Sequence, residues 1–362
     1  MKIVMIITGL GMGGAETQVC NLANAMAELD HDVTIISLAA IQEVQPGKKV
    51  KVYTLDMGKT ISGFIKAYLQ CRKIIKAIKP DVVHSHMVHA NIFARLLRLT
   101  LPIPRLICTA HSTNEGGKAR MLAYRLTDRL ADISTNVSQK AAEIFIRSKA
   151  ARRDGMIAVY NGIDTDRFAF SSDARLRLRN QLHIAEDTQL LITIGRLTPA
   201  KDYPNLLNAF ARIDPIHNAK LAIVGEGPLK SELQTLSQQL GISERVYWLG
   251  MQKNVAEWLS AGDVFVLSSE WEGFGLVVAE AMACGRVVVA TDAGGISEVM
   301  GSSEFLVPIK DPARLQEKIN AALNLSADEK ANIAVSNRKQ VVDRFSLPVI
   351  TQRWLAIYKD TL

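Results

Sequence analysis

The segment Val264–Gly295 (VFVLSSEWEGFGLVVAEAMACGRVVVATDAGG) restricts the fold of this chain more than any other stretch. Short valine-rich runs near its two ends predict buried strands, and the residues between them predict a helix. Two strands joined through a helix form the repeating unit of α/β proteins. The segment also carries two carboxylates, Glu272 in the loop before the predicted helix and Glu280 within it. Carboxylates at the mouth of an α/β unit predict a ligand site.

The same alternation of strand and helix extends along the whole chain. We expect further strands at 3–8, 33–38, 50–55, 80–86, 105–109, 133–137, 156–160, 190–194, 220–224, 246–249 and 304–308. This rhythm predicts an α/β protein with doubly wound, Rossmann-like parallel sheets, which bind ligands at the carboxyl ends of their strands. A chain of 362 residues exceeds one ordinary core. We therefore expect an N-terminal domain over 1–168, a C-terminal domain over 169–346, and a helix over 347–362 that packs back on the first domain.

The positive charge of the chain lies in its first half. Residues 1–168 carry 23 Lys and Arg against 14 Asp and Glu, whereas the remainder carries 20 against 22. In the stretches 64–79, 91–101 and 118–130, Lys and Arg alternate with large apolar residues. These stretches fit ordinary amphipathic helices, and they also fit a surface that rests on anionic lipid and receives an anionic acceptor. A nucleic-acid partner is not expected.

The cysteines and the hydropathy of the chain indicate a cytoplasmic protein. Cys20, Cys71, Cys108 and Cys284 lie far apart in apolar contexts without metal-ligand spacing, so we expect reduced core residues. The apolar N-terminus ends at Gly9, which fits a first strand better than a signal peptide. No run reaches the roughly 18 apolar residues of a membrane span.

A glycine-rich loop follows the first predicted strand. Gly9, Gly11 and Gly14 satisfy the GxGxxG pattern, which raises the possibility of an NAD-dependent oxidoreductase. That interpretation requires an acidic residue at the end of the second strand, where this chain has Leu38-Ala39-Ala40. The glycines retain a weaker meaning, because they let backbone N–H groups at a helix N-terminus approach an anion.

Two patterns resemble metal sites, and neither is favoured. His84, His86 and His89 form an imidazole-rich run, but no Asp or Glu accompanies them at a workable spacing. Asp164 and Asp166 form a DxD pattern, although their turn-rich context between two α/β blocks favours a hinge whose aspartates bond turn backbone. We expect no metal and no cofactor. His111, alone at the end of a strand, is the better candidate for chemistry.

Two cations follow the first strand of the second half. Arg196 and Lys201 lie five residues apart beyond the run LLITI. The guanidinium group of an Arg can donate two parallel hydrogen bonds, and the ammonium group of a Lys is a compact positive charge. Together, at the carboxyl end of a strand, they are suited to binding a diphosphate. The competing interpretation is a pair of surface cations beside Asp202.

Taken together, these motifs resemble retaining glycosyltransferase family 4, whose members have the two-domain GT-B fold with a central cleft. The resemblance rests on GMGGAET, YNGIDTDRF, IGRLTPAKD, VGEGP, and EGFGLVVAEAMACG with TDAGG, and it spans essentially the whole chain. Its most specific element is the pair Glu272 and Glu280 in the EGFG context. The chain departs from the family at Gly285-Arg286-Val287, where Pro is common, and at Gly294-Gly295-Ile296-Ser297-Glu298.

The resemblance implies roles for individual residues. Glu280 would accept hydrogen bonds from a ribose, and Glu272 would hold hydroxyls of the transferred sugar. Arg196 and Lys201 would neutralise the departing diphosphate in place of a metal ion, and His111 would lie over the sugar and stabilise positive charge or position its 6-hydroxyl. The remaining donor-binding residues would be Gly13, Gly14, Met251, Phe274, Gly275, Leu276 and Val277, the last four as the start of the helix.

The implied activity is retaining, metal-independent transfer of a hexose or N-acetylhexosamine from a nucleotide-sugar, most simply a UDP-sugar. The implied acceptor is a saccharide, in particular a polyprenyl-diphosphate-linked oligosaccharide of O-antigen or other bacterial cell-surface polysaccharide assembly, at the inner face of the membrane. A nucleotide-sugar epimerase or a phosphorylase of the same fold remains an alternative, as does a non-enzymatic sugar-binding protein.

Overall fold

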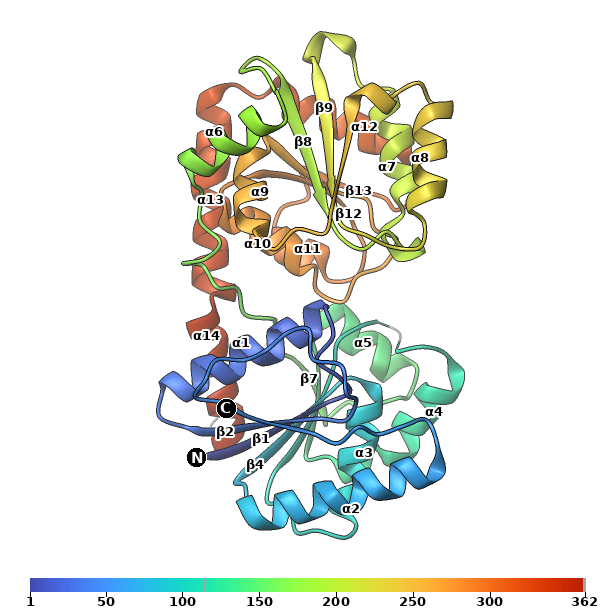
Figure 1. The fold of residues 1–362 in the computed structure, drawn as a ribbon, viewed down its shortest axis with the longest axis vertical. Helices are drawn as coiled ribbons and strands as arrows, with labels where there is room; N and C mark the ends of the chain where they lie inside the picture. Colours follow the sequence, from blue (N-terminus) through green and yellow to red (C-terminus); the bar gives the residue numbers. More distant parts are fainter. Residues whose placement is uncertain (114, 361–362) are drawn as a thin grey trace. The chain divides into compact units, whose positions relative to one another are not determined.

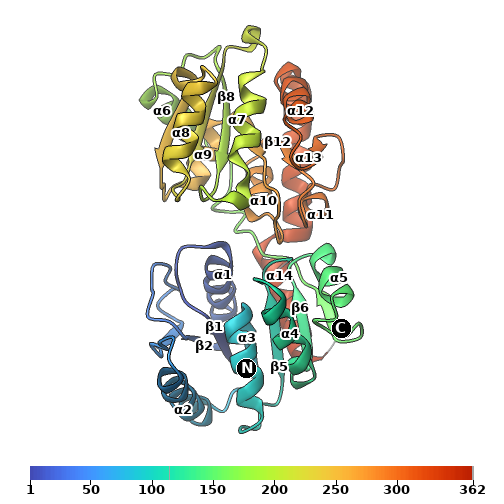
Figure 2. The same ribbon diagram turned by 90° about the vertical axis from the view of Figure 1, so that its right-hand side faces the viewer.

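A computed structural model describes residues 1–113 and 115–360 and divides the chain into two compact units (Figures 1 and 2). Unit 1 comprises residues 1–162 and 347–362, and unit 2 comprises residues 163–346. The division therefore falls before residue 163, earlier than the expected boundary after residue 168. The backbone gives the reason, because the Ile163 N–H donates to the Phe345 carbonyl at 2.7 Å and ties this part of the hinge to unit 2.

Unit 1 is a doubly wound parallel sheet with the strand order β3-β2-β1-β4-β5-β6-β7. Its elements are β1 (Lys2–Ile7), α1 (Gly14–Glu28), β2 (Asp32–Ser37), β3 (Lys51–Thr54), α2 (Ile61–Ile78), β4 (Val82–His86), α3 (Val88–Arg98), β5 (Leu106–Ala110), α4 (Lys118–Thr127), the 3-10 helix η1 (Asp128–Leu130), β6 (Ile133–Asn136), α5 (Gln139–Arg147), β7 (Met156–Ala158) and α14 (Leu347–Lys359). The predicted strands of the first half are thus confirmed, and the stretch 118–130 is an α-helix that ends in a 3-10 turn.

Helices cover both faces of this sheet, which explains why its strands are apolar on both sides. Ile3, Met5 and Ile7 of β1 pack with α1 and α14, while Val4 and Ile6 pack with α2 and α3. The C-terminal helix lies beside α1 in Figure 1 and contributes apolar side chains to the same cluster. The last helix of the chain is therefore part of the core of the first unit.

Unit 2 repeats this architecture with the parallel strand order β10-β9-β8-β11-β12-β13. Its elements are α6 (Ser172–Gln181), β8 (Gln189–Ile194), η2 (Pro199–Lys201), α7 (Tyr203–Ala211), η3 (Pro215–His217), β9 (Ala219–Val224), α8 (Lys230–Gln239), η4 (Ser243–Arg245), β10 (Val246–Gly250), α9 (Val255–Ala261), β11 (Val264–Leu267), α10 (Leu276–Ala283), β12 (Val287–Thr291), α11 (Ile296–Met300), β13 (Leu306–Val307), α12 (Pro312–Asn324) and α13 (Ala327–Phe345). The segment Val264–Gly295 is the β11-α10-β12 unit of this sheet, as predicted.

Two further expectations from the sequence are met. Cys20, Cys71, Cys108 and Cys284 are all unpaired and buried in the structure. In addition, none of the helices in the described part of the chain is both long and apolar enough to cross a bilayer.

Candidate active site

Lys201 and Glu272 meet at the carboxyl ends of the strands of unit 2. Lys201 lies in η2 after β8 and Glu272 in the loop after β11, and their Nζ and Oε1 atoms are 2.5 Å apart. Glu272 Oε1 also accepts a hydrogen bond of 2.7 Å from the Ser269 hydroxyl. The structure therefore brings together two of the predicted catalytic residues, and it adds Ser269, which the sequence did not single out.

Backbone contacts hold the two loops that carry this ion pair. The Glu270 N–H donates to the Ala200 carbonyl at 2.9 Å, and the Ser268 hydroxyl donates to the Lys201 carbonyl at 2.8 Å. Gly294 has φ 59°, and a Cβ atom there would lie 1.8 Å from the Glu272 carbonyl oxygen. No other residue type fits at that position without displacing the Glu272 backbone.

The helix α10 begins beside the ion pair. Gly275 caps it with φ 90°, and the first bond within the helix runs from the Val278 N–H to the Gly275 carbonyl at 3.0 Å. The N–H groups of Leu276 and Val277 precede that bond, so they remain available to an anion at the positive end of the helix dipole. The predicted start at Phe274 is wrong. The Phe274 ring is buried against Phe345, with 5.4 Å between ring centroids, because an aromatic side chain at this point fills the core under α13.

Glu280 lies in α10 one turn beyond these free N–H groups. The residue is partly buried, and its carboxylate accepts no hydrogen bond within residues 1–113 and 115–360. Burial raises the pKa of Glu280 to about 7, while the positive charge of Arg167 acts in the opposite direction. A desolvated carboxylate without donors is costly in the free protein and is relieved by a ligand that brings hydroxyl groups.

Arg196 and Met251 lie on two loops at the same edge of the sheet, on either side of the loop that follows β9. Arg196 follows β8 and is exposed, and within the described residues its guanidinium forms no ion pair. The β8 and β9 loops are in backbone contact, because a Cβ atom at Gly225 would lie 1.9 Å from the Gly195 carbonyl oxygen. Met251 follows β10, and the residue is 58% exposed. The roles of Arg196 at the diphosphate and of Met251 in donor binding stay predictions.

In unit 1, His111 follows β5 and contacts His86, the last residue of β4. The His86 Nδ1 and His111 Nε2 atoms are 3.2 Å apart. Burial lowers the pKa of His111 to about 4, so the imidazole is neutral at neutral pH and acts as a hydrogen-bonding group. A neutral imidazole is compatible with both expected roles of His111, stabilising positive charge and positioning a hydroxyl, and both stay predictions.

Glu115 supports this loop and was missed by the sequence analysis. Its two carboxylate oxygens accept from the His111 N–H at 2.8 Å and from the Val88 N–H at 2.9 Å. The second bond caps the N-terminus of α3, where a carboxylate is favourable. Met87, between β4 and α3, has φ 73°, so the chain turns from strand to helix through a strained residue.

The glycines of the first loop lie at the N-terminus of α1. Gly13 is the N-cap residue, in an extended conformation, and Gly14 is the first residue of the helix. The Glu16 carboxylate packs against Gly13, 2.5 Å from the place where a Cβ atom would be. An anion at this helix terminus would therefore have to displace the Glu16 side chain, and the role of Gly13 and Gly14 stays a prediction.

In each of the two metal-like patterns, at least one residue has hydrogen-bond partners within the protein. Asp164 Oδ1 accepts from the Arg167 N–H at 3.0 Å, as expected for a hinge turn. His84 bonds the Tyr358 and Thr109 hydroxyls, each at 2.6 Å, while His89 is exposed. Among residues 1–113 and 115–360, no three His, Cys, Asp or Glu side chains are grouped as a metal site would require.

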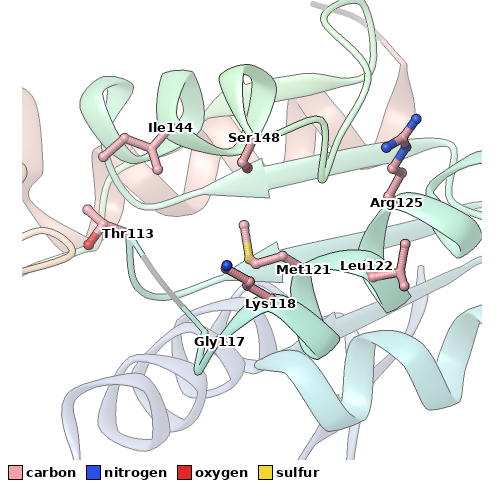
Figure 3. A pocket seen from close by; sticks show the side chains of 8 residues that line it. All are labelled: Thr113, Gly117, Lys118, Met121, Leu122, Arg125, Ile144 and Ser148. Atoms are coloured by element: carbon pink, nitrogen blue, oxygen red, sulfur yellow. The ribbon is translucent and has the colours of Figure 1, made fainter.

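A cavity of about 450 Å³ lies between α4 and α5 (Figure 3). Its lining residues are Thr113, Gly117, Lys118, Met121, Leu122, Arg125, Ile144 and Ser148. The lining combines apolar side chains with two cations from α4, and Thr113 lies two residues beyond His111. It is therefore suited to a ligand that has both an apolar and an anionic part.

Two family descriptions match this chain, one in each unit. Residues 12–167 match Glycosyltransferase Family 4, and residues 174–341 match Glycosyl transferases group 1. The N-acetyl-alpha-D-glucosaminyl L-malate synthase of Bacillus anthracis is 36% identical over 208 residues, which span 56% of this chain and 53% of that protein.

Other relatives match over nearly their full length. A Campylobacter jejuni enzyme, N-acetylgalactosamine-N,N'-diacetylbacillosaminyl-diphospho-undecaprenol 4-alpha-N-acetylgalactosaminyltransferase, is 25% identical over 356 residues, 93% of each chain. The crystal structure of Anabaena HepE in complex with UDP has the same fold, with a TM-score of 0.85 at 23% identity over 100% of both chains. The expected GT-B fold class is thereby confirmed. Because one of the two family models matches each unit, the chain belongs to the group 1 and family 4 glycosyltransferases.

Proposed function

We propose that this protein transfers a hexose or N-acetylhexosamine, with retention of configuration, from a UDP-sugar to a lipid-linked saccharide. The observation that carries the proposal is the partly buried Glu280: among the described residues, its carboxylate has no hydrogen-bond partner, and neither do two backbone N–H groups one helical turn before it. Ribose hydroxyls would supply the missing donors, and each hydrogen bond to a charged group contributes about 1.5 to 3 kcal/mol. The Lys201–Glu272 pair lies at the same sheet edge, where the sugar diphosphate would follow the ribose.

Backbone and side-chain groups of unit 2 would stabilise the leaving diphosphate. The Leu276 and Val277 N–H groups, Arg196 and Lys201 supply positive charge where negative charge develops as the sugar–phosphate bond breaks. We propose that they replace a metal ion. The Ser269 and Lys201 bonds to Glu272 orient that carboxylate toward sugar hydroxyls and away from a role as nucleophile.

The proposed reaction exchanges one C–O bond for another on the same face of the sugar. The bond from the anomeric carbon to the diphosphate oxygen breaks, and a bond to the acceptor oxygen forms. The acceptor proton moves to the departing diphosphate oxygen. The protein thus needs no separate base, which fits a neutral His111 whose pKa lies at about 4.

The cavity between α4 and α5 is proposed to hold the anionic part of the acceptor. Lys118 and Arg125 would contact a lipid diphosphate, while Met121 and Ile144 face its apolar neighbour. The Campylobacter jejuni relative is named for a diphospho-undecaprenol acceptor, whereas the Bacillus anthracis relative is named for L-malate. The exposed apolar residues beside the cavity, Leu122 and Leu126, favour the lipid-linked class.

A second part of the surface of unit 1, the exposed side of α2, is proposed to rest on an anionic membrane. Ile61, Ile65 and Leu69 form an exposed apolar row at helical spacing on α2, which also carries Lys66 and Lys73. An amphipathic surface of this kind binds anionic bilayers from the side. Vesicle flotation at low salt tests this, with Ile65→Ser and Leu69→Ser together as the perturbed variant and Val335→Ser, an exposed residue of unit 2, as the control.

A product assay tests the proposed function. UDP-, GDP- and ADP-sugars are offered in turn with an undecaprenyl-diphosphate-linked saccharide or with L-malate, in the presence and absence of EDTA. We expect transfer from a UDP-sugar to the lipid-linked acceptor, unaffected by EDTA, with a product whose anomeric coupling matches that of the donor. Transfer only to L-malate, inversion, or strict need for a divalent ion would each overturn the corresponding part of the proposal.

A further inference from the structure

We propose that His86 is a positioning residue that fixes the proton of His111 on Nδ1, so that His111 offers an N–H donor to its ligand. The identity of that ligand, a sugar oxygen, rests on the proposed function. The position of the proton does not, because it follows from the geometry of unit 1 alone.

The argument starts from the register of two neighbouring strands. His86 ends β4 opposite Thr109 of the parallel strand β5, and His111 follows Thr109 by two residues. This register places the rings side by side, with 5.4 Å between centroids and 3.2 Å from His86 Nδ1 to His111 Nε2. Two neutral imidazoles at this distance share one hydrogen, which belongs either to His86 Nδ1 or to His111 Nε2.

The far side of the His86 ring decides between the two arrangements. His86 is 2% exposed, and its Nε2 atom is buried without a hydrogen-bond partner among the described residues. If His111 donated, the single proton of neutral His86 would sit on this Nε2 as a buried N–H without an acceptor. If His86 donates, only a lone pair is left there, and orphaned N–H groups are rarer in proteins than unsatisfied acceptors. His86 Nδ1–H therefore donates to His111 Nε2.

The surroundings of His86 keep the pair in this geometry. The His84 ring lies against it at 3.9 Å between centroids, and His84 is itself bonded at both ring nitrogens. On the other side, Glu115 connects the His111 and Val88 N–H groups, which follow β5 and β4 respectively. The two strand ends are thus tied together twice, once through the imidazoles and once through the carboxylate.

In His111, this arrangement makes Nε2 the hydrogen-bond acceptor and Nδ1 the hydrogen-bond donor. Its Nε2 lone pair is occupied by His86, and its Nδ1 has no partner within residues 1–113 and 115–360. With the proton on Nδ1, His111 donates a hydrogen bond to a sugar oxygen and has no free lone pair with which to accept the acceptor proton. This agrees with a reaction in which that proton leaves with the diphosphate.

Nitrogen NMR of the free protein tests the tautomer directly. The protein is labelled with ¹⁵N-histidine, and long-range ¹H–¹⁵N correlations are recorded at pH 7.5, with His111 assigned by its loss in His111→Ala. We expect the protonated nitrogen of His111 to be Nδ1 and that of His86 to be Nδ1 as well. A His111 proton on Nε2, or an even mixture of tautomers, would overturn the proposal whatever the enzyme transfers.

Two variants of His86 then test the function of the bond. Asn places an amide nitrogen two bonds from Cβ, where His has Nδ1, whereas Leu keeps the volume and removes the donor. We expect His86→Leu to lower kcat about 10- to 100-fold, as loss of an orienting partner does, and His86→Asn to recover most of it. His86→Leu should add nothing further in a His111→Ala background. Equal kcat for Asn, Leu and wild type, with unchanged Tm, would refute the positioning role even if glycosyl transfer is established.

Discussion

Replacing Glu280 with Gln should stabilise the free protein at alkaline pH while it weakens donor binding. The pKa of Glu280 is raised by burial from an ordinary 4.5 to about 7, a difference worth about 3 kcal/mol at 1.36 kcal/mol per unit. The figure is an upper value, because the side chain keeps some contact with water that screens its charge. Gln retains the shape of the side chain and carries no charge to desolvate.

The sign of the effect depends on pH. Below about pH 4.5 the carboxyl is protonated in both the folded and the unfolded protein, so it costs nothing. As pH rises toward 7, the unfolded chain ionises first and the folded state loses stability. Above about pH 7 both states are ionised, and the full cost remains. Wild type and Glu280→Gln should therefore be equally stable at pH 4.5 and differ most at pH 8.

Urea unfolding at pH 5 and pH 8 measures this difference. Three of the four tryptophans, Trp248, Trp258 and Trp271, lie in unit 2, so their fluorescence reports on the unit that holds Glu280. Glu304→Gln, an exposed carboxylate of the same unit, serves as the control. In parallel, calorimetry should show that Glu280→Gln binds UDP-sugar about 10-fold or more weakly, because the variant loses at least one hydrogen bond to a charged group. A variant that is less stable at pH 8, or that binds donor unchanged, would refute the reasoning.

Three further outcomes are expected. UDP-sugar binding to wild type should release up to one proton near pH 6 and none at pH 9, because the ligand binds the ionised form of Glu280. Calorimetric titration in buffers of different ionisation enthalpy measures the number of protons released. Equal proton release in Glu280→Gln would contradict this prediction. Lys201→Ala should lower kcat about 100-fold, as loss of one preorganised charge contact does. The control Lys310→Ala removes only the ion pair with Glu270 and should leave kcat unchanged. Gly294→Ala should lower Tm and kcat together, because the added Cβ atom would overlap the Glu272 carbonyl. The control Gly241→Ala has a similar φ but open space around the Cβ atom, so it should lower the free energy of unfolding only by the backbone strain of about 1 kcal/mol. Equal effects of the two substitutions would show that the contact with Glu272 is unimportant.

The strand-and-helix rhythm was sufficient to predict both sheets, because parallel strands covered on two faces are apolar throughout. The pairing of Lys201 with Glu272 was partly within reach, since both follow strands of one sheet and strand ends meet at one edge. Phe274 shows the limit of such reasoning. A residue next to a helix start can serve the core, and only the packing against Phe345 reveals that it does.

The contact of His86 with His111 and the role of Glu115 were missed for a different reason. His86 matters because the β4–β5 register brings its Nδ1 to His111, and register is a property of two strands that neither sequence segment contains alone. Glu115 lies in a loop without periodicity, and its importance comes from two backbone N–H groups on separate elements. The available signal was the coincidence of two histidine-bearing strand ends, HSH and TAH, on consecutive strands of a parallel sheet.

The incorporation of α14 into unit 1 sets the order in which the protein can fold during synthesis. Ile350, Trp354 and Ile357 belong to the cluster that holds β1 and α1, so that core stays incomplete until α14, which follows unit 2 in the sequence, has left the ribosome. Unit 2 is continuous and can finish earlier. β1 and α1 thus precede unit 2 in the sequence but reach their final packing after it, with apolar surface exposed meanwhile, and Tyr358 of α14 then completes the hydrogen bonds of His84.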